Sequence, residues 1–236
     1  MGSRSSSVDI SKKIDTSIPF KKLIVIIGGS SGLGVGLSFK LKNNYEVISL
    51  SSKDLDITNQ EDLRTFFNNK KVDILINLSG YNYDCLIHKY EESNYLEIDK
   101  QIDIVCKGGI NVLNACLPKM RKAGYGRIIF ISSILVSKPV IGTSVYTASK
   151  SFIESLMKTC AKENSQKGIT SNAIQLGYFN AGLTKKIAPA NQITLKENIP
   201  SKRWGELDEL ENVIRCIIQT EYINGSVLRL TGGAEL

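Results

Sequence analysis

The sequence predicts a single α/β domain built on a doubly wound parallel sheet. Short apolar runs alternate with helical patterns along the chain, which is typical of strands joined by right-handed helical crossovers. The runs are apolar at successive positions, as expected for strands that helices cover on both faces. The 236 residues, 42% of them hydrophobic, suffice for one well-buried core, and no change in composition marks a second domain.

The elements can be placed in order along the chain. We expect strands at six apolar runs, residues 23–27, 45–50, 72–78, 127–132, 170–175 and 226–230. Two long helices are expected over residues 93–122 and 146–166. Only five residues, 51–55, follow the second strand before Asp56-Ile57-Thr58, which predicts a direct link into a short third strand at 56–58. Residues 177–205 lack a firm pattern; such a long loop is often a lid, and a pair of surface helices is the alternative.

The N-terminal residues 1–22 are polar, rich in serine and without periodicity, so we expect a flexible arm before a domain at 23–236. The Met-Gly-x-x-x-Ser start fits both an N-myristoylation signal and the remnant of an expression vector, and we favour the remnant. No signal peptide is visible, and no apolar run approaches the ~18 residues that span a bilayer. We therefore expect a cytoplasmic protein without a membrane segment.

Charge and cysteine content narrow the class of protein further. The net charge is +7, but the lysines are scattered and no basic stripe is interleaved with aromatic residues, so we do not expect a nucleic-acid partner. The excess of positive charge favours binding of NADPH, an acidic acyl carrier or a phosphorylated substrate, although most individual lysines are expected on the solvated surface. The five cysteines indicate reduced thiols, not a disulfide framework. No cluster has metal-ligand spacing, and the only histidine, His88, is expected at the surface.

A glycine-rich segment follows the first predicted strand. Residues Gly28-Gly29-Ser30-Ser31-Gly32-Leu33-Gly34 lie between that strand and a helical pattern. This order places free backbone N–H groups and a positive helix end where a pyrophosphate can bind, and the glycines let the backbone approach it. The spacing is G-x-x-x-G-x-G and not the usual G-x-G-x-x-G, and a simple tight turn is the alternative.

A second motif consists of Ser133, Tyr146 and Lys150. In a helix Tyr146 and Lys150 form an i,i+4 pair on one face. A nearby ammonium favours the phenolate, so we expect the pKa of Tyr146 to be lowered and the residue to act as a general acid. Ser133 ends an apolar run and is placed to hydrogen-bond a substrate carbonyl. A Tyr-x-x-x-Lys pair alone also occurs by chance on many helices.

Together, the glycines, Asn77-Leu78-Ser79-Gly80, Ser133 and the Tyr146–Lys150 pair have the order and spacing of a known family. Over about residues 22–233 the chain resembles the short-chain dehydrogenase/reductase superfamily, in its classical 3-oxoacyl-thioester-reductase-like branch. The resemblance implies a Rossmann-like domain, a nicotinamide cofactor and hydride transfer to or from a carbonyl or alcohol. It also implies a homodimer or homotetramer formed by the two long helices, a substrate lid at 177–205, and an acyl carrier protein as one candidate partner.

The resemblance assigns catalysis to Ser133, Tyr146 and Lys150. It assigns cofactor binding to Gly28, Ser30, Ser31, Gly32, Leu33, Gly34, Ser51, Ser52, Lys53, Asp56, Ile57, Asn77, Ser79, Gly80, Tyr146, Lys150 and Gly177. A helix that the family places between its second and third strands is missing, which implies a more open flank of the adenosine site.

Residues after the second strand bear on the choice of coenzyme. An NAD-selective enzyme usually has an Asp or Glu there to bind the ribose hydroxyls. Here the place falls on Ser51, followed by Ser52 and Lys53, whose hydroxyls and ammonium suit a 2′-phosphate. We therefore expect NADP(H), with NAD(H) as the alternative if Asp54 takes the ribose position.

The chain departs from the family pattern at a few positions. Alignment of Leu117-Pro118-Lys119-Met120 puts Val105 where the family has an asparagine associated with a water that links the lysine to solvent. Valine cannot serve such a proton relay, and Asn111 is expected to face another side of the helix. Ala181 replaces a threonine that often contacts the nicotinamide.

The leading hypothesis is thus an NADP(H)-dependent reductase that converts a ketone to an alcohol. A 3-oxoacyl thioester, a keto-sugar or another small ketone would fit. Val105 and Ala181 motivate the alternative, a catalytically weak nucleotide-binding sensor or oligomer partner of the same fold. Retention of Ser133, Tyr146 and Lys150 argues against that alternative.

Overall fold

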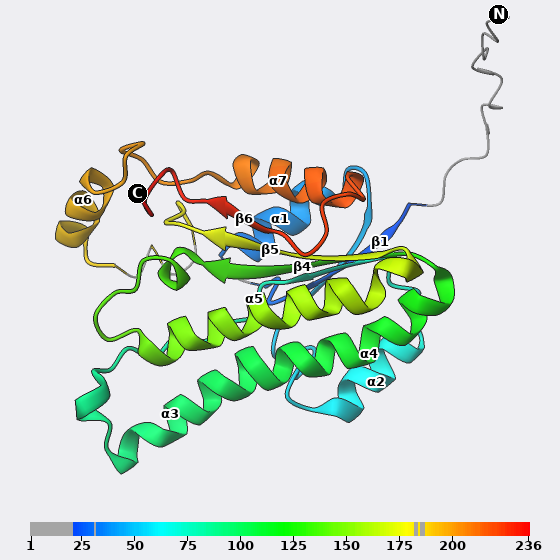
Figure 1. Ribbon diagram of the computed structural model, residues 1–236, viewed down its shortest axis with the longest axis horizontal. Coiled ribbons are helices and arrows are strands. Elements are labelled where there is room, and N and C mark those ends of the chain that lie inside the picture. The colour runs from blue at the N-terminus through cyan, green and yellow to red at the C-terminus, as the bar shows by residue number, and fades with distance from the viewer. Residues whose placement is uncertain (1–20, 31, 182–183, 185–186) are drawn as a thin grey trace, which may run out of the picture.

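The computed structural model describes residues 21–30, 32–181, 184 and 187–236. Within them six parallel strands form one sheet in the order β2-β1-β3-β4-β5-β6 (Figure 1). The strands are β1 (Leu23–Ile27), β2 (Glu46–Leu50), β3 (Ile74–Asn77), β4 (Gly126–Ser133), β5 (Ile169–Leu176) and β6 (Val227–Leu230). The predicted Rossmann-like α/β fold is confirmed, and a strand forms at each of the six apolar runs.

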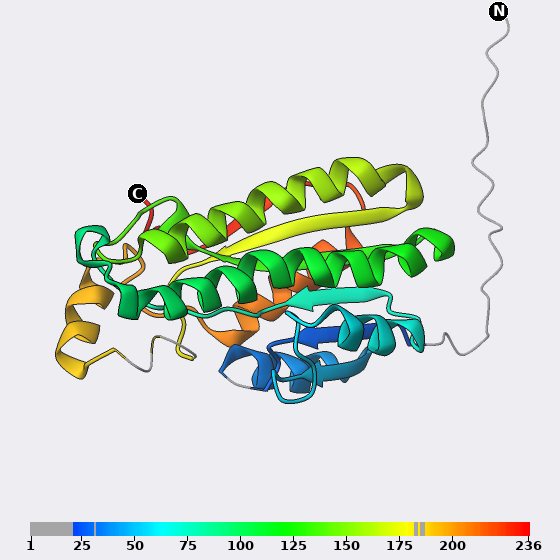
Figure 2. The same cartoon turned by 90° about the horizontal axis from the view of Figure 1, so that it is seen from below.

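Helices cover both faces of the sheet, as Figures 1 and 2 show. On one face lie α1 (Leu33–Leu41) and α7 (Leu207–Gln219); on the other lie α2 (Gln60–Asn68), α4 (Gly108–Ala123) and α5 (Ser144–Asn164). The strand β1 serves both cores because successive side chains point to opposite faces. Ile24 and Ile26 pack in the cluster with α1 and α7, and Val25 and Ile27 pack in the cluster with α2, α4 and α5.

The long helix predicted over 93–122 forms with an irregularity in its middle. It comprises α3 (Glu92–Ile102), a π-helical turn at Asp103–Lys107, and α4. A π-turn inside an α-helix often lies at a functional site, because the extra residue changes which side chains face a neighbour. Here the turn contains Val105, whose side chain is 2% exposed and belongs to the apolar core.

Residues 51–59 contain turns and no helix, as predicted, but the short strand predicted at 56–58 is wrong. The carboxylate of Asp56 accepts hydrogen bonds from the backbone N–H and the hydroxyl of Thr58, at 2.9 and 2.7 Å, and curls the chain there. Asn59 then caps α2 by accepting from Glu61 N at 2.9 Å. Because no strand forms at 56–58, α2 lies between the second and third strands of the sheet, and the prediction that a helix is missing between those strands is wrong.

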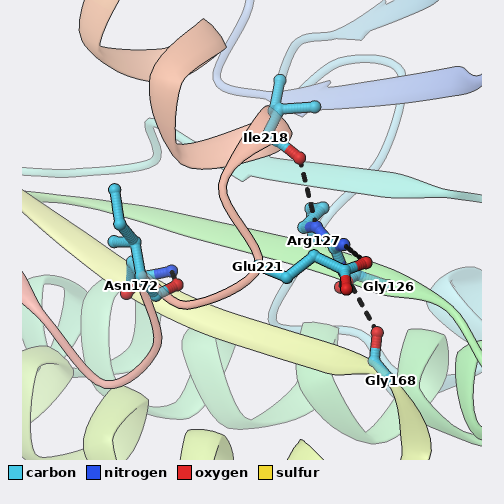
Figure 3. Close-up of polar contacts among 7 residues, drawn as sticks. Gly126, Arg127, Gly168, Asn172, Ile218 and Glu221 are labelled. Carbon is cyan, nitrogen blue, oxygen red and sulfur yellow. Dashed lines mark hydrogen bonds and ion pairs between the residues drawn. The ribbon is translucent and has the colours of Figure 1, made fainter. Parts of the chain in front are cut away.

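A buried arginine fastens the amino end of β4. Only 2% of the Arg127 side chain is exposed, and Figure 3 shows its guanidinium between the end of α7 and the start of β5. It donates to the carbonyls of Ile218, Gly126 and Gly168 at 3.2, 2.9 and 3.0 Å and pairs with Glu221 at 2.5 Å. Because its donors are matched by acceptors, this buried charge holds three segments together at the end of the sheet away from Ser133.

The remaining predictions of organisation concern the arm and the lid. Residues 1–20 of the predicted arm at 1–22 lie outside the described residues. Within the predicted lid at 177–205, α6 (Pro189–Glu197) forms, and residues 182–183 and 185–186 lie outside the described residues. Among the helices that the structure describes, none has both the length and the apolar character to cross a membrane.

Candidate active site

The candidate site lies at the carboxyl ends of the strands, which a parallel sheet brings to one edge. The glycine turn follows β1, the Asn77–Gly80 segment follows β3, and Ser133 ends β4. In doubly wound sheets this edge is where ligands bind. Each motif that the sequence singled out therefore reaches the same region.

The glycine turn packs too tightly for side chains. Gly28 has φ +77°, and a Cβ there would lie 3.0 Å from the backbone N of Ser79. A Cβ on Gly34 would lie 2.5 Å from the Cα of Gly29, so the first turn of α1 rests on the glycine turn itself. Gly32, with φ +53°, precedes α1 and directs the helix start to this edge. This is a backbone cradle of the kind that fits a pyrophosphate.

The segment after β3 lies beside that cradle. The Asn77 side chain is 3% exposed, and its carbonyl oxygen accepts from Ser79 N at 2.9 Å, which holds the turn toward Gly80. On the cradle itself Ser30 is exposed, Leu33 begins α1, and the predicted contact Ser31 lies outside the described residues.

After β2, where the adenosine was expected, Asp54 lies directly against Ser51. One carboxylate oxygen of Asp54 accepts from the Ser51 N–H at 2.8 Å and from its hydroxyl at 2.6 Å. These bonds lower the pKa of Asp54, so it is a carboxylate at neutral pH. The side chains of Ser52 and Lys53 are exposed next to this pair. Ser51, the predicted ligand of the 2′-phosphate of NADP(H), is thus bonded to Asp54, the residue that would bind the ribose hydroxyls of NAD(H).

Ile57 and Gly177, two other predicted cofactor contacts, also have a role in the packing of the fold. Ile57 is 6% exposed and packs against α4, where a Cβ on Gly108 would lie 2.6 Å from it, so only the backbone of Ile57 can meet a ligand. A Cβ on Gly177 would lie 2.8 Å from the Cα of Thr231, so this glycine permits the close approach of the segments after β5 and β6.

The three predicted catalytic residues come together. Tyr146 and Lys150 lie one turn apart on α5, and the Ser133 hydroxyl faces the Tyr146 phenol. Lys150 is 4% exposed and donates to the carbonyl of Ile131 at 2.8 Å. Its ammonium nitrogen lies 5.8 Å from the centre of the Tyr146 ring. A phenol and a hydroxyl therefore converge on one point, with a cation behind them.

The expected lowering of the Tyr146 pKa is wrong. Burial raises the pKa of Tyr146, the hydroxyl of Ser133 lowers it by less, and the charge of Asp84 adds to the increase. The spacing in sequence identified Lys150 as a neighbour, but it could not reveal how deeply the phenol is buried. Burial also lowers the pKa of Lys150 to about 8. The Tyr146 phenol is therefore protonated at neutral pH.

Sequence reasoning missed several residues around this centre. The charge of Asp84, in the loop after β3, raises the pKa of Tyr146, and no local sequence pattern predicted this contribution. Glu154 is 8% exposed and accepts from Ser132 at 2.5 Å and from Gln175 at 2.8 Å, so it joins the ends of β4 and β5 beneath the site. The i,i+4 series that contains Tyr146 and Lys150 continues to Glu154, and that spacing could have found it.

The structure also changes the interpretation of Val105. Its side chain lies in the apolar core, whereas Cys106, the next residue of the π-turn, lies beside Ser149 and Lys150. Asn111 donates to the Ile57 carbonyl at 3.1 Å and faces away from the centre, as predicted. The residue of this turn that borders Lys150 is therefore a thiol and not valine.

A separate cavity of about 460 Å³ lies on another face of α5. It is lined by residues 85–87, 139–140, 142–144, 147–148 and 151. The α5 residues among these share a face that does not contain Tyr146 or Lys150. In the described parts of the chain, no group of three or more His, Cys, Asp or Glu side chains could hold a metal ion.

Comparison with known proteins agrees with this geometry. Residues 41–235 match the family model described as Enoyl-(Acyl carrier protein) reductase. The 3-oxoacyl-(acyl-carrier-protein) reductase FabG of Rickettsia bellii is 30% identical over 213 residues, 89% of this chain and 85% of that protein. The FabG of Staphylococcus epidermidis is 30% identical over 164 residues, 69% of this chain and 66% of that protein.

Relatives of similar overall length are also found. The 3-oxoacyl-(acyl-carrier-protein) reductase of Bos taurus is 27% identical over 239 residues, which cover 91% of this chain and 98% of that protein. The solved structure of ElxO with NADP bound superposes with a TM-score of 0.81 at 22% identity, over 91% of this chain and 98% of that one, and shows the same fold. From the family model and these relatives, the chain belongs to the short-chain dehydrogenase/reductase superfamily of oxidoreductases.

Proposed function

We propose that the protein reduces a ketone to an alcohol with NADPH. The observation that carries the proposal is the convergence of Ser133 and Tyr146, backed by Lys150, at the sheet edge that also holds the glycine cradle. The nicotinamide, when bound, would supply the hydride. Gly28, Gly32 and Gly34 would hold its pyrophosphate.

The side chains of this site would divide the work on the carbonyl oxygen. Ser133 would donate a hydrogen bond to that oxygen and stabilise the charge that develops on it. Tyr146 would give its proton to the same oxygen, because a phenol with a raised pKa arrives protonated. Lys150 would hold a positive charge beside the phenol and bind the nicotinamide ribose.

NADP(H) is the proposed coenzyme. Support comes from the hydroxyls and ammonium of Ser51, Ser52 and Lys53, and from the likeness to ElxO, whose structure holds NADP. Asp54 is the counter-argument, because its carboxylate would repel a 2′-phosphate and favour NAD(H).

A 3-oxoacyl thioester is the proposed substrate class, with an acyl carrier protein as the candidate carrier. The names of the bacterial and bovine relatives support it, and a net charge of +7 suits an acidic carrier. We also propose a cytoplasmic homodimer or homotetramer. The exposed apolar side chains of Phe152 on α5 and Ile110 on α4 support association through these helices.

The test is NADPH oxidation by the purified protein with a 3-oxoacyl thioester, a keto-sugar and a small ketone. Turnover that Tyr146→Phe abolishes supports the proposal. Binding of NADPH without turnover on any member of the panel supports the second candidate, a catalytically weak nucleotide-binding protein. The specific observation in favour of that candidate is that Lys150 does not offset the effect of burial on the Tyr146 pKa.

A further inference from the structure

Lysines that are scattered along the sequence gather at one end of the fold. The helices that connect the strands run antiparallel to them, so they end where the strands begin, at the right-hand end in Figure 1. We call this end the amino edge, and its segments are residues 21–22, 42–46, 68–73, 121–127, 162–168 and 219–225. They hold ten lysine and arginine residues but only four aspartate and glutamate residues. The amino edge therefore carries a charge of +6, against +7 for the whole chain.

Contacts between these segments make the amino edge one continuous surface. Lys21 donates to the carbonyl of Asn43 at 3.3 Å, which joins the start of β1 to the turn after α1. The ammonium nitrogen of Lys22 lies 3.8 Å from the centre of the Tyr125 ring, in the turn before β4. Arg127 connects the start of β4 to the start of β5 and the end of α7 (Figure 3). A partner that meets one of these segments therefore also meets its neighbours.

Helix dipoles account for only part of this charge. A cation in the last turn of a helix complements the helix dipole, and Arg121, Lys122 and Lys162 have that position. The lysine pairs at 21–22 and 70–71, however, lie outside every described helix. Like charges gathered on one surface repel one another, and an anionic partner offsets that repulsion. The excess of positive charge is therefore better explained by a partner than by the stability of the helices.

The cations that this edge leaves free are lysines. Both arginines are engaged, because Arg121 donates to Asn164 Oδ1 at 2.6 Å and the buried Arg127 is paired with Glu221. Exposed lysine side chains without a hydrogen bond or an ion pair among the described residues are those of Lys42, Lys71, Lys122, Lys162 and Lys167. A guanidinium recognises one phosphate or base edge through paired hydrogen bonds, whereas an ammonium acts as a hydrated point charge. This edge therefore suits an extended anionic surface better than a single bound phosphate or a base sequence.

Exposed aromatic rings lie at the same end. Tyr222, in the turn between α7 and β6, is 101% exposed. Phe39, in the last turn of α1 and just before Lys42, is 78% exposed. Aromatic rings beside lysines are typical of protein surfaces that meet phospholipid headgroups. Because the six segments share one end of the sheet, a planar surface can meet them together.

We propose that the amino edge binds the surface of a membrane that contains anionic phospholipids, with Tyr222 among the headgroups. Lysines close to such a surface are attracted by its negative potential, so the association is reversible and sensitive to salt. From Gly126 to Ser133 the strand β4 extends about 23 Å, at about 3.3 Å per residue. The candidate active site thus faces away from the membrane and stays open to coenzyme and substrate. The proposal does not depend on the proposed reaction, because membrane binding is measured without substrate.

Cosedimentation of the full chain with lipid vesicles is the test. One set of vesicles is made of phosphatidylcholine alone, and the other also contains phosphatidylserine. Binding is expected only to the vesicles with phosphatidylserine. It should be lost when the salt concentration is raised from about 0.1 M to about 1 M, because the Debye length falls from about 10 Å to about 3 Å. Equal binding to both sets, or binding to neither, would overturn the proposal.

The decisive variant combines Lys71→Gln, Lys122→Gln and Lys167→Gln, three exposed side chains from different segments of the amino edge. Its partition onto the phosphatidylserine vesicles should fall about 100-fold, because each lysine close to an anionic membrane strengthens binding about fivefold. The combination of Lys71→Arg, Lys122→Arg and Lys167→Arg keeps the charges and should bind as the wild type does.

The matched control changes three exposed lysines elsewhere. Lys89→Gln, Lys100→Gln and Lys138→Gln together remove the same charge from the loop after β3, from α3 and from the loop after β4. This control should keep most of the wild-type binding, because its lysines lie outside the amino edge. If it loses as much binding as the variant of the amino edge, the net charge and not this surface causes the attraction, and the proposal is overturned.

Fluorescence gives the orientation of the bound protein. The chain has one tryptophan, Trp204, whose side chain is 7% exposed. In Tyr222→Trp the emission should shift to shorter wavelength when phosphatidylserine vesicles are added, whereas Tyr95→Trp, at a 55% exposed position on α3, should show no shift. A shift in Tyr95→Trp alone would contradict the proposed orientation. Binding of a DNA duplex without binding of the vesicles would also overturn the proposal, in favour of a nucleic-acid partner.

Discussion

The hydroxyl of Ser51 donates to the carboxylate of Asp54 at 2.6 Å, directly after the end of β2. The backbone N–H of Ser51 donates to the same carboxylate oxygen at 2.8 Å. A hydroxyl suited to a phosphate is therefore already engaged by a negative charge. We propose that the balance between these two groups sets the preference for NADPH over NADH.

We predict that Asp54→Asn raises the ratio of kcat/KM for NADPH to kcat/KM for NADH by roughly tenfold, which corresponds to about 1.4 kcal/mol. The amide keeps the shape of the side chain and removes the charge that would repel a 2′-phosphate. Asp62→Asn is the control, because it removes an exposed carboxylate on α2 that is not among the predicted cofactor contacts. An unchanged ratio in Asp54→Asn would remove Asp54 from the discrimination, and a wild-type preference for NADH would make it the ribose ligand.

Tyr146→Phe should lower kcat by roughly 10²-fold or more, the usual worth of a positioned acid, and leave the Kd for NADPH nearly unchanged. The variant removes one oxygen and retains the ring in its buried position. Tyr90→Phe is a matched control, because the Tyr90 hydroxyl bonds Ser144 at 2.8 Å, in the first turn of α5 and two residues before Tyr146. Near-full activity of Tyr146→Phe would rule out the proposed proton donor.

The raised pKa of Tyr146 predicts different pH profiles for the two directions of the reaction. Ketone reduction needs the protonated phenol and should hold its rate through neutral pH. Oxidation of the product alcohol needs the phenolate and should rise with pH toward the phenol pKa, which lies above 10. Rates of both directions over a pH series would check this, and a fall in reduction between pH 6 and 8 would contradict it.

Asp84→Asn extends the same test. The charge of Asp84 contributes to the raised pKa of Tyr146, so its removal should move the oxidation profile to lower pH. Asp99→Asn changes a carboxylate on α3, outside the loop that carries Asp84, and should leave the pH profile of alcohol oxidation unchanged.

The strands, and the meeting of Ser133, Tyr146 and Lys150 at one edge of the sheet, could be predicted because their signals are local. Residues 23–27 are apolar throughout and could only be a strand buried on both faces. The order of Ser133, Tyr146 and Lys150 was equally legible in the sequence. By contrast, Asp56-Ile57-Thr58 resembles a strand by composition, yet the Asp56 side chain captures the Thr58 N–H and forms a turn.

Burial is what the sequence did not reveal. The pKa of Tyr146 is raised, not lowered, because the surrounding elements bury the phenol. The spacing of residues along α5 contains no information about that burial. Likewise an amphipathic reading of α3 gives no reason for Gln101 to be wholly buried. The π-turn at 103–107 exchanges the roles of Val105 and Cys106, and alignment by residue number cannot detect such a change.

Lys150→Met should stabilise the fold at neutral pH while it destroys activity. Below pH 8 the wild type carries a buried ammonium at Lys150. The change of its pKa from 10.5 to about 8 corresponds to a loss of roughly 3 kcal/mol in the free energy of unfolding, which the variant avoids. The variant also loses the hydrogen bond to the Ile131 carbonyl, at a cost of about 1 kcal/mol. Between pH 8 and 10.5 only the unfolded wild type keeps that proton, so the wild type gains stability as pH rises and the difference narrows. Urea unfolding at pH 7 and pH 9.5 measures the free energy of unfolding of both proteins. If the difference between Lys150→Met and the wild type is the same at the two pH values, the burial argument is contradicted.

Val105→Asn should destabilise the protein and leave turnover no faster. The Val105 side chain is 2% exposed and lies in the apolar core, so an amide there would be buried without a partner, at a cost of about 1–3 kcal/mol in the free energy of unfolding. An asparagine at this position would serve a proton relay only if it faced Lys150, and in this structure Cys106 does so. Val105→Thr is the matched control, because its hydroxyl can bond the backbone carbonyl one turn earlier and should lower stability by less. Urea unfolding, kcat and the solvent isotope effect of both variants make the comparison. A higher kcat with a smaller isotope effect in Val105→Asn would contradict this prediction. It would show that an asparagine at position 105 can take part in proton transfer to Lys150.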